Sequence, residues 1–292
     1  MQVQPDDFKV LATIARYYLL TRDQIQSICF PGQTSGRSTR RRLLRLRDAG
    51  YLTKHRVPVA LPETNGAAPV YYVTKSGAEA LASYFEDERF RATNTRHPRA
   101  DRLSHWTAIN QTRLLLERAI AAQSHVQLSG WFTEWETVNK DAAAKDQFVL
   151  HTQLSEEPPL SCSPDAAFML TVGGASKVFY LEQDLGTSSP TQIAARKTKG
   201  YASMLQRELH RKHFPETTVS RFSVLVVTNS AYRCKAIGEA LRKKPNPEAW
   251  LLINQKELTV DSFLHSSIVY DTRGELGPLV KPAVPVGEPS PT

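Results

Sequence analysis

The sequence predicts a two-domain protein of the α+β/α/β class, in which a small helical domain with a β-hairpin precedes a larger α/β domain. The chain has 292 residues, of which 41% are hydrophobic, so it is long enough for two domains with a core in each. Helical periodicity and turn residues alternate through the first 85 residues. From residue 165 onward, strand-like alternation, one continuous apolar run and further helical segments follow one another.

The first 85 residues carry the pattern of three helices, a β-hairpin and a fourth helix. Thr21 and Gln24 form a capping box that begins the second helix, and Pro31-Gly32 ends it. The expected helices cover residues 6–20, 21–30, 35–49 and 76–85, and the expected strands cover 51–57 and 70–74. This is the order of a winged helix-turn-helix domain, in which the third helix enters the major groove of DNA and the hairpin contacts the backbone.

The third of these helices is rich in arginine. Six arginines and one acid, Asp48, lie between residues 35 and 52. At about 3.6 residues per turn, the apolar residues form one stripe, and Arg37, Arg41 and Arg45 lie near the opposite face. Such a helix can pack on a core and present positive charge to a partner, although a merely solvated face is the alternative. The predicted DNA contacts are Arg37, Ser38, Arg40, Arg41, Arg42 and Arg45 in this helix, with Lys54 and Arg56 at the start of the hairpin.

Charge is distributed unevenly along the chain. The whole chain carries a net charge of +8, residues 1–60 carry +7, and residues 133–184 carry −6. This asymmetry favours a polyanion as partner of the N-terminal domain and a cation site in the middle of the chain. The three cysteines are far apart, which argues against zinc or disulfides and favours a reducing, cytoplasmic location. No apolar run approaches about 18 residues, so we expect no membrane span.

Changes in composition predict the domain boundaries. We expect a winged helix-turn-helix domain over residues 1–85, a polar linker over 86–101, an α/β domain over 102–276 and a Pro-rich disordered tail over 277–292. The α/β domain has the expected order helix, strand, β-hairpin, helix, buried strand, helix and strand. That order is typical of a restriction-endonuclease-like core.

The hairpin of the α/β domain gathers acidic residues. With a turn at residues 173–176, Val172 lies opposite Lys177, and Asp165 lies opposite Asp184. This register places three carboxylates on one face of the hairpin: Asp165, Glu182 and Asp184.

Such a cluster needs a compensating cation. Like charges directly opposite each other destabilise a sheet by roughly 0.2–1 kcal/mol. Mg²⁺ or Mn²⁺ would suit the oxygen ligands. Lys197 is the other candidate, because it lies on the stripe of the following helix that faces the sheet. The alternative is that the cluster has no special role. In that case the acids lie at a strand end that faces solvent, and Lys197 extends its charged end into water.

Several of these segments together resemble the replication-relaxation family, which is found on plasmids and integrated mobile elements. The resemblance covers roughly residues 6–270 and rests on RRLLRLRDAGYL, YYVTKSGAEAL, RLSHWTAINQTRLLLE, PDAAFML, VFYLEQDLGT and KTKGYASML. It implies a role in plasmid replication or DNA relaxation. The second half also resembles PD-(D/E)xK nucleases, which implies a metal on Asp165 and Glu182. With Asp184 from the same face of the hairpin, the predicted metal ligands are Asp165, Glu182 and Asp184. The predicted catalytic set adds Lys197, which would replace from the helix the lysine of that class. Active members of that class keep a lysine where this chain has Asp184, which favours a degenerate site.

Three functions stay open at this point. The first is a double-stranded DNA-binding protein of a plasmid or mobile element, acting in replication, relaxation or mobilisation, with an active or degenerate nuclease-like domain. The second is a non-enzymatic winged-helix transcription regulator whose C-terminal domain forms a homodimer or binds a partner. The third is an accessory protein that recruits a relaxase or a replication initiator. Metal-dependent nicking of plasmid DNA separates the first function, with an active domain, from the other two.

Overall fold

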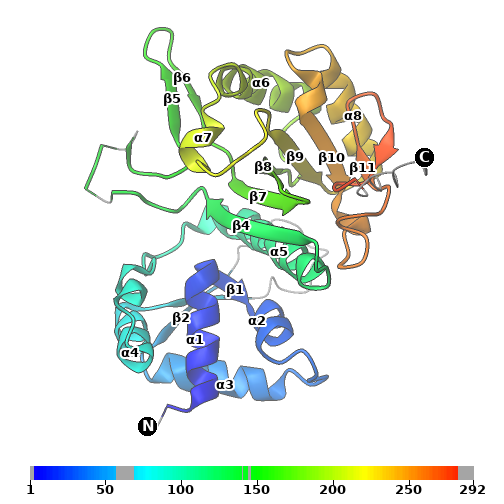
Figure 1. Ribbon diagram of the computed structural model, residues 1–292. Coiled ribbons are helices and arrows are strands. Elements are labelled where there is room, and N and C mark those ends of the chain that lie inside the picture. The colour runs from blue at the N-terminus through cyan, green and yellow to red at the C-terminus, as the bar shows by residue number, and fades with distance from the viewer. Residues whose placement is uncertain (1–2, 57–68, 140, 144–145, 282–292) are drawn as a thin grey trace, which may run out of the picture. The chain divides into compact units, whose positions relative to one another are not determined.

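The computed structural model describes residues 3–56, 69–139, 141–143 and 146–281. The chain divides into two compact units, Met1–Gln111 and Thr112–Thr292, which are described separately below. Figure 1 shows that the first unit is mainly helical and that the second is built around a large sheet. No helix within the described ranges is long and apolar enough to cross a membrane.

The first unit has the element order of a winged helix-turn-helix domain. Its elements are α1 (Pro5–Tyr17), β1 (Leu19–Thr21), α2 (Arg22–Cys29), α3 (Arg37–Asp48), β2 (Leu52–His55), β3 (Val70–Val73) and α4 (Lys75–Phe85). The three strands form one sheet in the order β1-β3-β2. β2 and β3 are the predicted hairpin, and residues 57–68 between them lie outside the described residues. The short strand β1 replaces the predicted end of the first helix, because α1 stops where Tyr18 adopts a positive φ of 68°.

Local signals in the sequence explain how these elements begin and pack. The Thr21 side chain accepts a hydrogen bond from the Gln24 backbone N–H at 3.2 Å, and the Gln24 side chain accepts one from the Thr21 N–H at 3.0 Å, which confirms the predicted capping box. α4 lies close to the backbone before β2, since a Cβ on Gly77 would stand 2.3 Å from the Tyr51 carbonyl oxygen. The core between the helices is formed by Leu11, Ile14, Ile25, Leu43, Leu46 and Leu81.

The segment predicted to be a linker belongs to the first unit. Residues 86–101 contain two short 3-10 helices, η1 (Glu88–Ala92) and η2 (Ala100–Arg102). The Tyr18 hydroxyl donates to the Arg96 carbonyl at 3.0 Å, and the Tyr72 hydroxyl lies 2.7 Å from His97 Nδ1. These contacts anchor a stretch that has no periodic apolar pattern. The boundary between the units falls after Gln111, within α5 (Leu103–Ala121), and not at residue 101 as predicted.

The second unit is built on a seven-stranded mixed sheet in the order β12-β11-β10-β9-β8-β7-β4. Its strands are β4 (Val126–Thr133), β7 (Ala166–Val172), β8 (Ala175–Gln183), β9 (Ser223–Thr228), β10 (Trp250–Asn254), β11 (Val269–Tyr270) and β12 (Leu276–Gly277). β8, β9 and β10 run parallel, whereas β4, β7 and β8 are antiparallel neighbours. A separate hairpin consists of β5 (Thr152–Ser155) and β6 (Leu160–Cys162).

Two helices cover one face of this sheet. α6 (Pro190–Gln206) and α8 (Ala231–Arg242) contribute Tyr201, Met204 and Ile237 to the same buried cluster as Tyr180 of β8 and Val224 of β9. The predicted helix after the hairpin ends at Gln206, and α7 (His210–His213) is a separate short helix. Figure 1 shows α6 and α8 beside the parallel strands. The alternation of β8 therefore directs one set of its side chains toward α6.

The register of the β7–β8 hairpin differs from the prediction by two residues. Val172 lies opposite Ala175, not opposite Lys177. The cause is a tight turn at Gly173 and Gly174, with φ of 55° and 82°, because two positive φ values in succession allow a two-residue loop. Since strand faces alternate with a period of two, a shift of two leaves the composition of each face unchanged. Asp165 and Glu182 therefore still share a face.

The predicted Pro-rich tail overlaps the end of the fold. β12 and the residues after it are part of the second unit, since Val280 is buried and its N–H donates to the Leu264 carbonyl at 2.9 Å. Residues 282–292, to which the rest of that prediction applies, lie outside the described residues.

Candidate nucleic-acid interface and acidic cluster

α3 divides its side chains between a buried stripe and an exposed face. Thr39, Leu43 and Leu46 are almost completely buried, which follows from their spacing of three and four residues. The exposed side chains include four of the predicted DNA contacts: Arg37, Ser38, Arg40 and Arg41. Within the described residues, Arg37, Arg40 and Arg41 form no ion pair with an acid. Three guanidinium groups of α3 are thus available to an anionic partner.

Arg42 and Arg45 are oriented differently from the prediction. Arg42 Nη1 lies 2.6 Å from Asp7 Oδ1, and Arg45 Nη2 lies 3.1 Å from the same oxygen. Arg42 also contacts Asp6 at 3.2 Å, and its guanidinium lies 5.4 Å from the ring centre of Phe30. At about 100° per residue, Arg45 stands roughly 80° from Arg37 around the helix, so it reaches the flank that faces α1. These two arginines attach α3 to α1.

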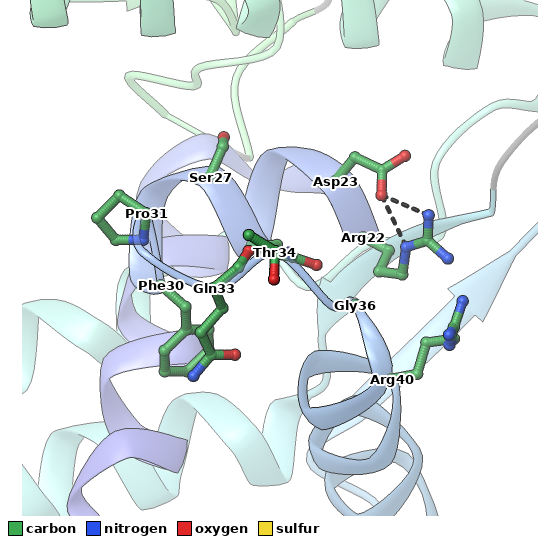
Figure 2. Close-up of a pocket in the computed structure, with 10 residues that line it drawn as sticks. Arg22, Asp23, Ser27, Phe30, Pro31, Gln33, Thr34, Gly36 and Arg40 are labelled. Carbon is green, nitrogen blue, oxygen red and sulfur yellow. Dashed lines mark hydrogen bonds and ion pairs between the residues drawn. The ribbon is translucent and has the colours of Figure 1, made fainter.

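A polar cavity of about 320 Å³ lies at the turn between α2 and α3. Figure 2 shows Arg22 paired with Asp23 on the same side of the view as Arg40, with Phe30 and Pro31 on the opposite side. The α3 N-terminus at Gly36 has no side-chain cap, and Ser38 at the start of α3 donates a hydrogen bond to the Gln33 side chain. The cavity is lined by Arg22, Asp23, Gln26, Ser27, Phe30, Pro31, Gln33, Thr34, Gly36 and Arg40.

A second basic surface lies at the start of the hairpin. Lys54 and Arg56 are both exposed, as the prediction of DNA contacts requires. Together with Arg47 they line a cavity of about 540 Å³, whose other walls are Gly50, Leu52, Thr53 and Thr74. Arg47 is partly neutralised by Asp48 at 2.8 Å. The positive charge of α3 therefore continues onto β2.

Glu182 in the second unit is buried against two side chains of α6. Lys197 Nζ lies 2.7 Å from Glu182 Oε2, and the Tyr201 hydroxyl donates to Glu182 Oε1 at 2.5 Å. Lys197 also donates to the Ser163 carbonyl at 3.2 Å. The prediction that Lys197 lies on the stripe facing the sheet is confirmed. Gly200 permits the close approach of α6 to β6, since a Cβ there would lie 3.1 Å from the Ser161 carbonyl oxygen.

Burial controls the ionisation of this cluster. Desolvation raises the pKa of Glu182 to about 7, against the attraction of Lys197 and with a further contribution from the negative charge of Asp165. Burial disfavours the charged form of Lys197, but Glu182 and Asp165 outweigh it, so the pKa of Lys197 is raised. Burial also raises the pKa of Tyr201, which therefore remains a neutral donor. The cluster has its own cation in place.

The three predicted carboxylates do not converge on one point. Asp165 Oδ2 accepts a hydrogen bond from the Gln183 N–H at 2.7 Å. Asp184 follows the last residue of β8 and turns to α8, where Arg233 Nη2 donates to its Oδ1 at 2.8 Å and Arg233 Nε contacts its Oδ2. Among the described residues, no set of ligand atoms within 4.8 Å of one another includes Glu182 or Asp184.

The ionisation of Asp184 reflects this separate environment. Burial opposes its charge, but hydrogen bonds from Arg233 and from the Thr228 hydroxyl at 2.7 Å outweigh that effect and hold the pKa of Asp184 below its ordinary value. Two of the three predicted ligands are therefore already neutralised by protein cations. The arrangement does not fit a divalent cation shared by Asp165, Glu182 and Asp184.

Three residues that define these sites were not among the predicted ones. Asp7 and Arg233 are distant in sequence from their partners, so spacing gives no signal for them. Tyr201 lay on the predicted stripe of the helix with Lys197, four residues further on. A tyrosine at that position on a helix facing buried acids is the signal that could have identified the Glu182 donor.

Two solved structures are similar to parts of the chain. One is a protein with a GntR superfamily winged-helix-turn-helix domain from Halomicrobium mukohataei, with 22% identity, a TM-score of 0.26, and coverage of 36% of this chain and 76% of that chain. The other is the multiple antibiotic resistance repressor MarR, with 17% identity, a TM-score of 0.23, and coverage of 40% of this chain and 77% of that chain.

No curated protein matches the chain. The family described as replication-relaxation matches residues 11–217, which is well over half of the 292 residues and includes α2, α3, the hairpin, Glu182 and Lys197. The chain therefore belongs to the replication-relaxation family.

Proposed function

We propose that this protein binds double-stranded DNA through α3 and the β2–β3 hairpin, and that it acts in the replication or mobilisation of a plasmid or integrated mobile element. One observation carries the proposal: two groups of α3 arginines differ in their partners, while Arg47 pairs with its neighbour Asp48. Arg42 and Arg45 are held by Asp7, whereas Arg37, Arg40 and Arg41 are exposed without an acidic partner among the described residues. Membership of the replication-relaxation family supports the biological setting.

The exposed side chains suit the two kinds of contact that DNA recognition needs. Arginine forms bidentate hydrogen bonds with phosphates and with the O6 and N7 atoms of guanine. Residues in the first turns of a recognition helix, here Arg37, Ser38 and Arg41, are those that reach base edges. Lys54 and Arg56 would contact phosphates and fix the orientation on the duplex.

For the second unit we propose a restriction-endonuclease-like fold that has lost nuclease activity. The order of α5, the antiparallel strands β4, β7 and β8, then α6, β9, α8 and β10 supports that fold. The Glu182–Lys197 and Asp184–Arg233 pairs support the loss of activity, because they neutralise two of the carboxylates that a catalytic metal would need. The same pairs favour the alternative of a non-enzymatic transcription regulator over that of an active nickase.

Two assays test this function. Titration of the full chain with a fluorescently labelled duplex should give saturable binding that weakens steeply with salt, because phosphate contacts release counterions. Incubation with supercoiled plasmid and Mg²⁺ or Mn²⁺ should give no nicked product. Absence of duplex binding at low salt would refute the DNA-binding function, and metal-dependent nicking that is lost in Asp165→Asn would refute the loss of activity.

A further inference from the structure

A chain of stacked aromatic rings reaches the surface of the first unit. Phe8 of α1 stacks on Tyr84 of α4 with 3.7 Å between ring centres. Tyr84 meets Phe85 edge-on at 4.9 Å, and Phe85 stacks on Phe90 of η1 at 5.4 Å. Phe8 is buried, but Tyr84 and Phe85 are 46% and 44% exposed. We call Tyr84, Phe85 and Phe90 the aromatic patch.

The rim of the aromatic patch carries both signs of charge. Glu86, Glu88, Arg89 and Arg91 all lie within residues 86–91 and are exposed. Arg91 pairs with Glu88 at 2.8 Å, and Arg89 pairs with Asp87 at 2.8 Å, while the side chains of Arg89 and Arg91 remain 91% and 59% exposed. Exposed pairs of this kind contribute little to stability, so a partner could replace them at small cost.

The composition of the patch identifies the class of partner. Contiguous exposed aromatic rings with a polar rim are typical of protein interfaces, in which aromatic residues and arginine are enriched. DNA is a poor partner, because Glu86, Asp87 and Glu88 would face its phosphates. A partner of one charge sign would leave half of the rim opposite like charge. The partner that fits is therefore a protein surface with an apolar centre and with both positive and negative side chains around that centre.

We propose that two copies of this chain form a two-fold dimer through their aromatic patches. In a two-fold interface the same surface serves both partners, so it must be complementary to itself. The patch meets this condition: rings can stack on rings across the axis, and arginines at residues 89 and 91 can face acids at 86 and 88 of the other copy. This inference is independent of DNA binding, since the patch shares no residue with the exposed face of α3.

The first test is the oligomeric state of the full chain without DNA, measured by analytical ultracentrifugation. We expect the wild type to be dimeric at micromolar concentration, and Phe85→Glu to raise the dimer dissociation constant by about tenfold or more, as for a central interface residue. Its far-UV circular dichroism spectrum should match that of the wild type, because Phe85 is 44% exposed at the last residue of α4. Tyr232→Glu is the matched control, since Tyr232 is 83% exposed on α8, outside the patch, and should leave the dimer intact.

The second test shows whether the aromatic patch binds the same patch of a second copy or a different surface. An all-acidic rim (Arg89→Glu with Arg91→Glu) and a mainly basic rim (Glu86→Lys with Glu88→Lys, which keeps Asp87) should each weaken self-association, because like charges then predominate across the axis. An equimolar mixture of the two variants should recover a dimer that contains one copy of each. A monomeric wild type up to high micromolar concentration, a dimeric Phe85→Glu protein, or a mixture that does not recover association would each overturn the proposal.

Discussion

The carboxylate of Asp7 in α1 lies 2.6 Å from the guanidinium of Arg42 in α3, and only 1% of the Asp7 side chain is exposed. Arg45 and the Gln4 backbone N–H contact the same carboxylate, at 3.1 and 3.0 Å. One buried acid thus neutralises two arginines of the proposed DNA-binding helix and fixes that helix against α1. Arg37, Arg40 and Arg41 lie on the exposed side of α3 because of their positions around the helix.

Removal of this acid should destabilise the first unit. The Asp7→Asn substitution removes the buried negative charge that accepts hydrogen bonds from Arg42 and Arg45. We expect this loss to lower the free energy of unfolding by about 2–3 kcal/mol. Urea denaturation followed by circular dichroism measures it. Asp6→Asn is the control, because Asp6 contacts Arg42 at 3.2 Å but is 59% exposed, so its replacement should change stability by less than about 0.5 kcal/mol. Equal effects of the two variants would show that Asp7 has no special role.

Lys197 should be required for stability when Glu182 is ionised. Lys197→Met leaves the Glu182 carboxylate buried without its cation, with an expected cost of roughly 3 kcal/mol at pH 8. The cost should be smaller near pH 5, where Glu182 takes up a proton. Lys199→Met, an exposed lysine on the same helix, should have little effect at either pH. A cost for Lys197→Met that does not depend on pH would contradict the pairing.

The raised pKa of Glu182 predicts a specific pH dependence of stability. The folded protein holds the proton on Glu182 up to about pH 7, whereas the unfolded chain releases it near 4.5, so the contribution of this residue is complete below about pH 4.5 and is lost as the pH rises through 7. His213 acts in the opposite direction, because burial lowers its pKa to about 4. The measurement is therefore the difference in unfolding free energy between wild type and Glu182→Gln across pH 4 to 8. A flat difference would contradict the assignment.

Divalent cations should not stabilise the protein. The carboxylates of Glu182 and Asp184 are paired with Lys197 and Arg233, and a ligand raises the melting temperature only if it binds the native state. Differential scanning fluorimetry with millimolar Mg²⁺ or Mn²⁺ should therefore give the melting temperature of the metal-free protein. A rise that disappears in Asp165→Asn would restore the metal site that the sequence predicted.

Much of the fold could be predicted because its signals are local. The capping box at Thr21, the arginine helix, whose observed bounds are Arg37–Asp48, and the orientation of Lys197 all depend on residues within one or two turns of one another. The hairpin register was missed by two residues because Gly173-Gly174 closes a two-residue turn, and the sequence around it also allows a four-residue turn. The two faces of the hairpin were still assigned correctly, because side chains alternate between the faces and a shift of two residues returns each one to the same face.

The remaining features depend on contacts between distant residues. The Asp7–Arg42 pair spans 35 residues and the Asp184–Arg233 pair spans 49, and no periodic pattern connects them. Residues 86–101 lack apolar periodicity, yet Tyr18 and Tyr72 anchor them from other elements. Polar composition alone therefore predicted a linker where the structure has a packed segment.

The central claim is that the outward arginines of α3 contact DNA phosphates and bases. The most direct test is the salt dependence of duplex affinity for wild type and for Arg37→Ala with Arg41→Ala, with Arg196→Ala and Lys199→Ala on α6 as a control of equal charge loss. If both arginines contact phosphates, the double variant should bind more weakly and its log–log salt slope should fall by about 0.9 for each lost contact. The control should keep both the affinity and the slope of the wild type. An unchanged affinity and slope in the Arg37→Ala, Arg41→Ala protein, with its fold intact, would contradict the claim.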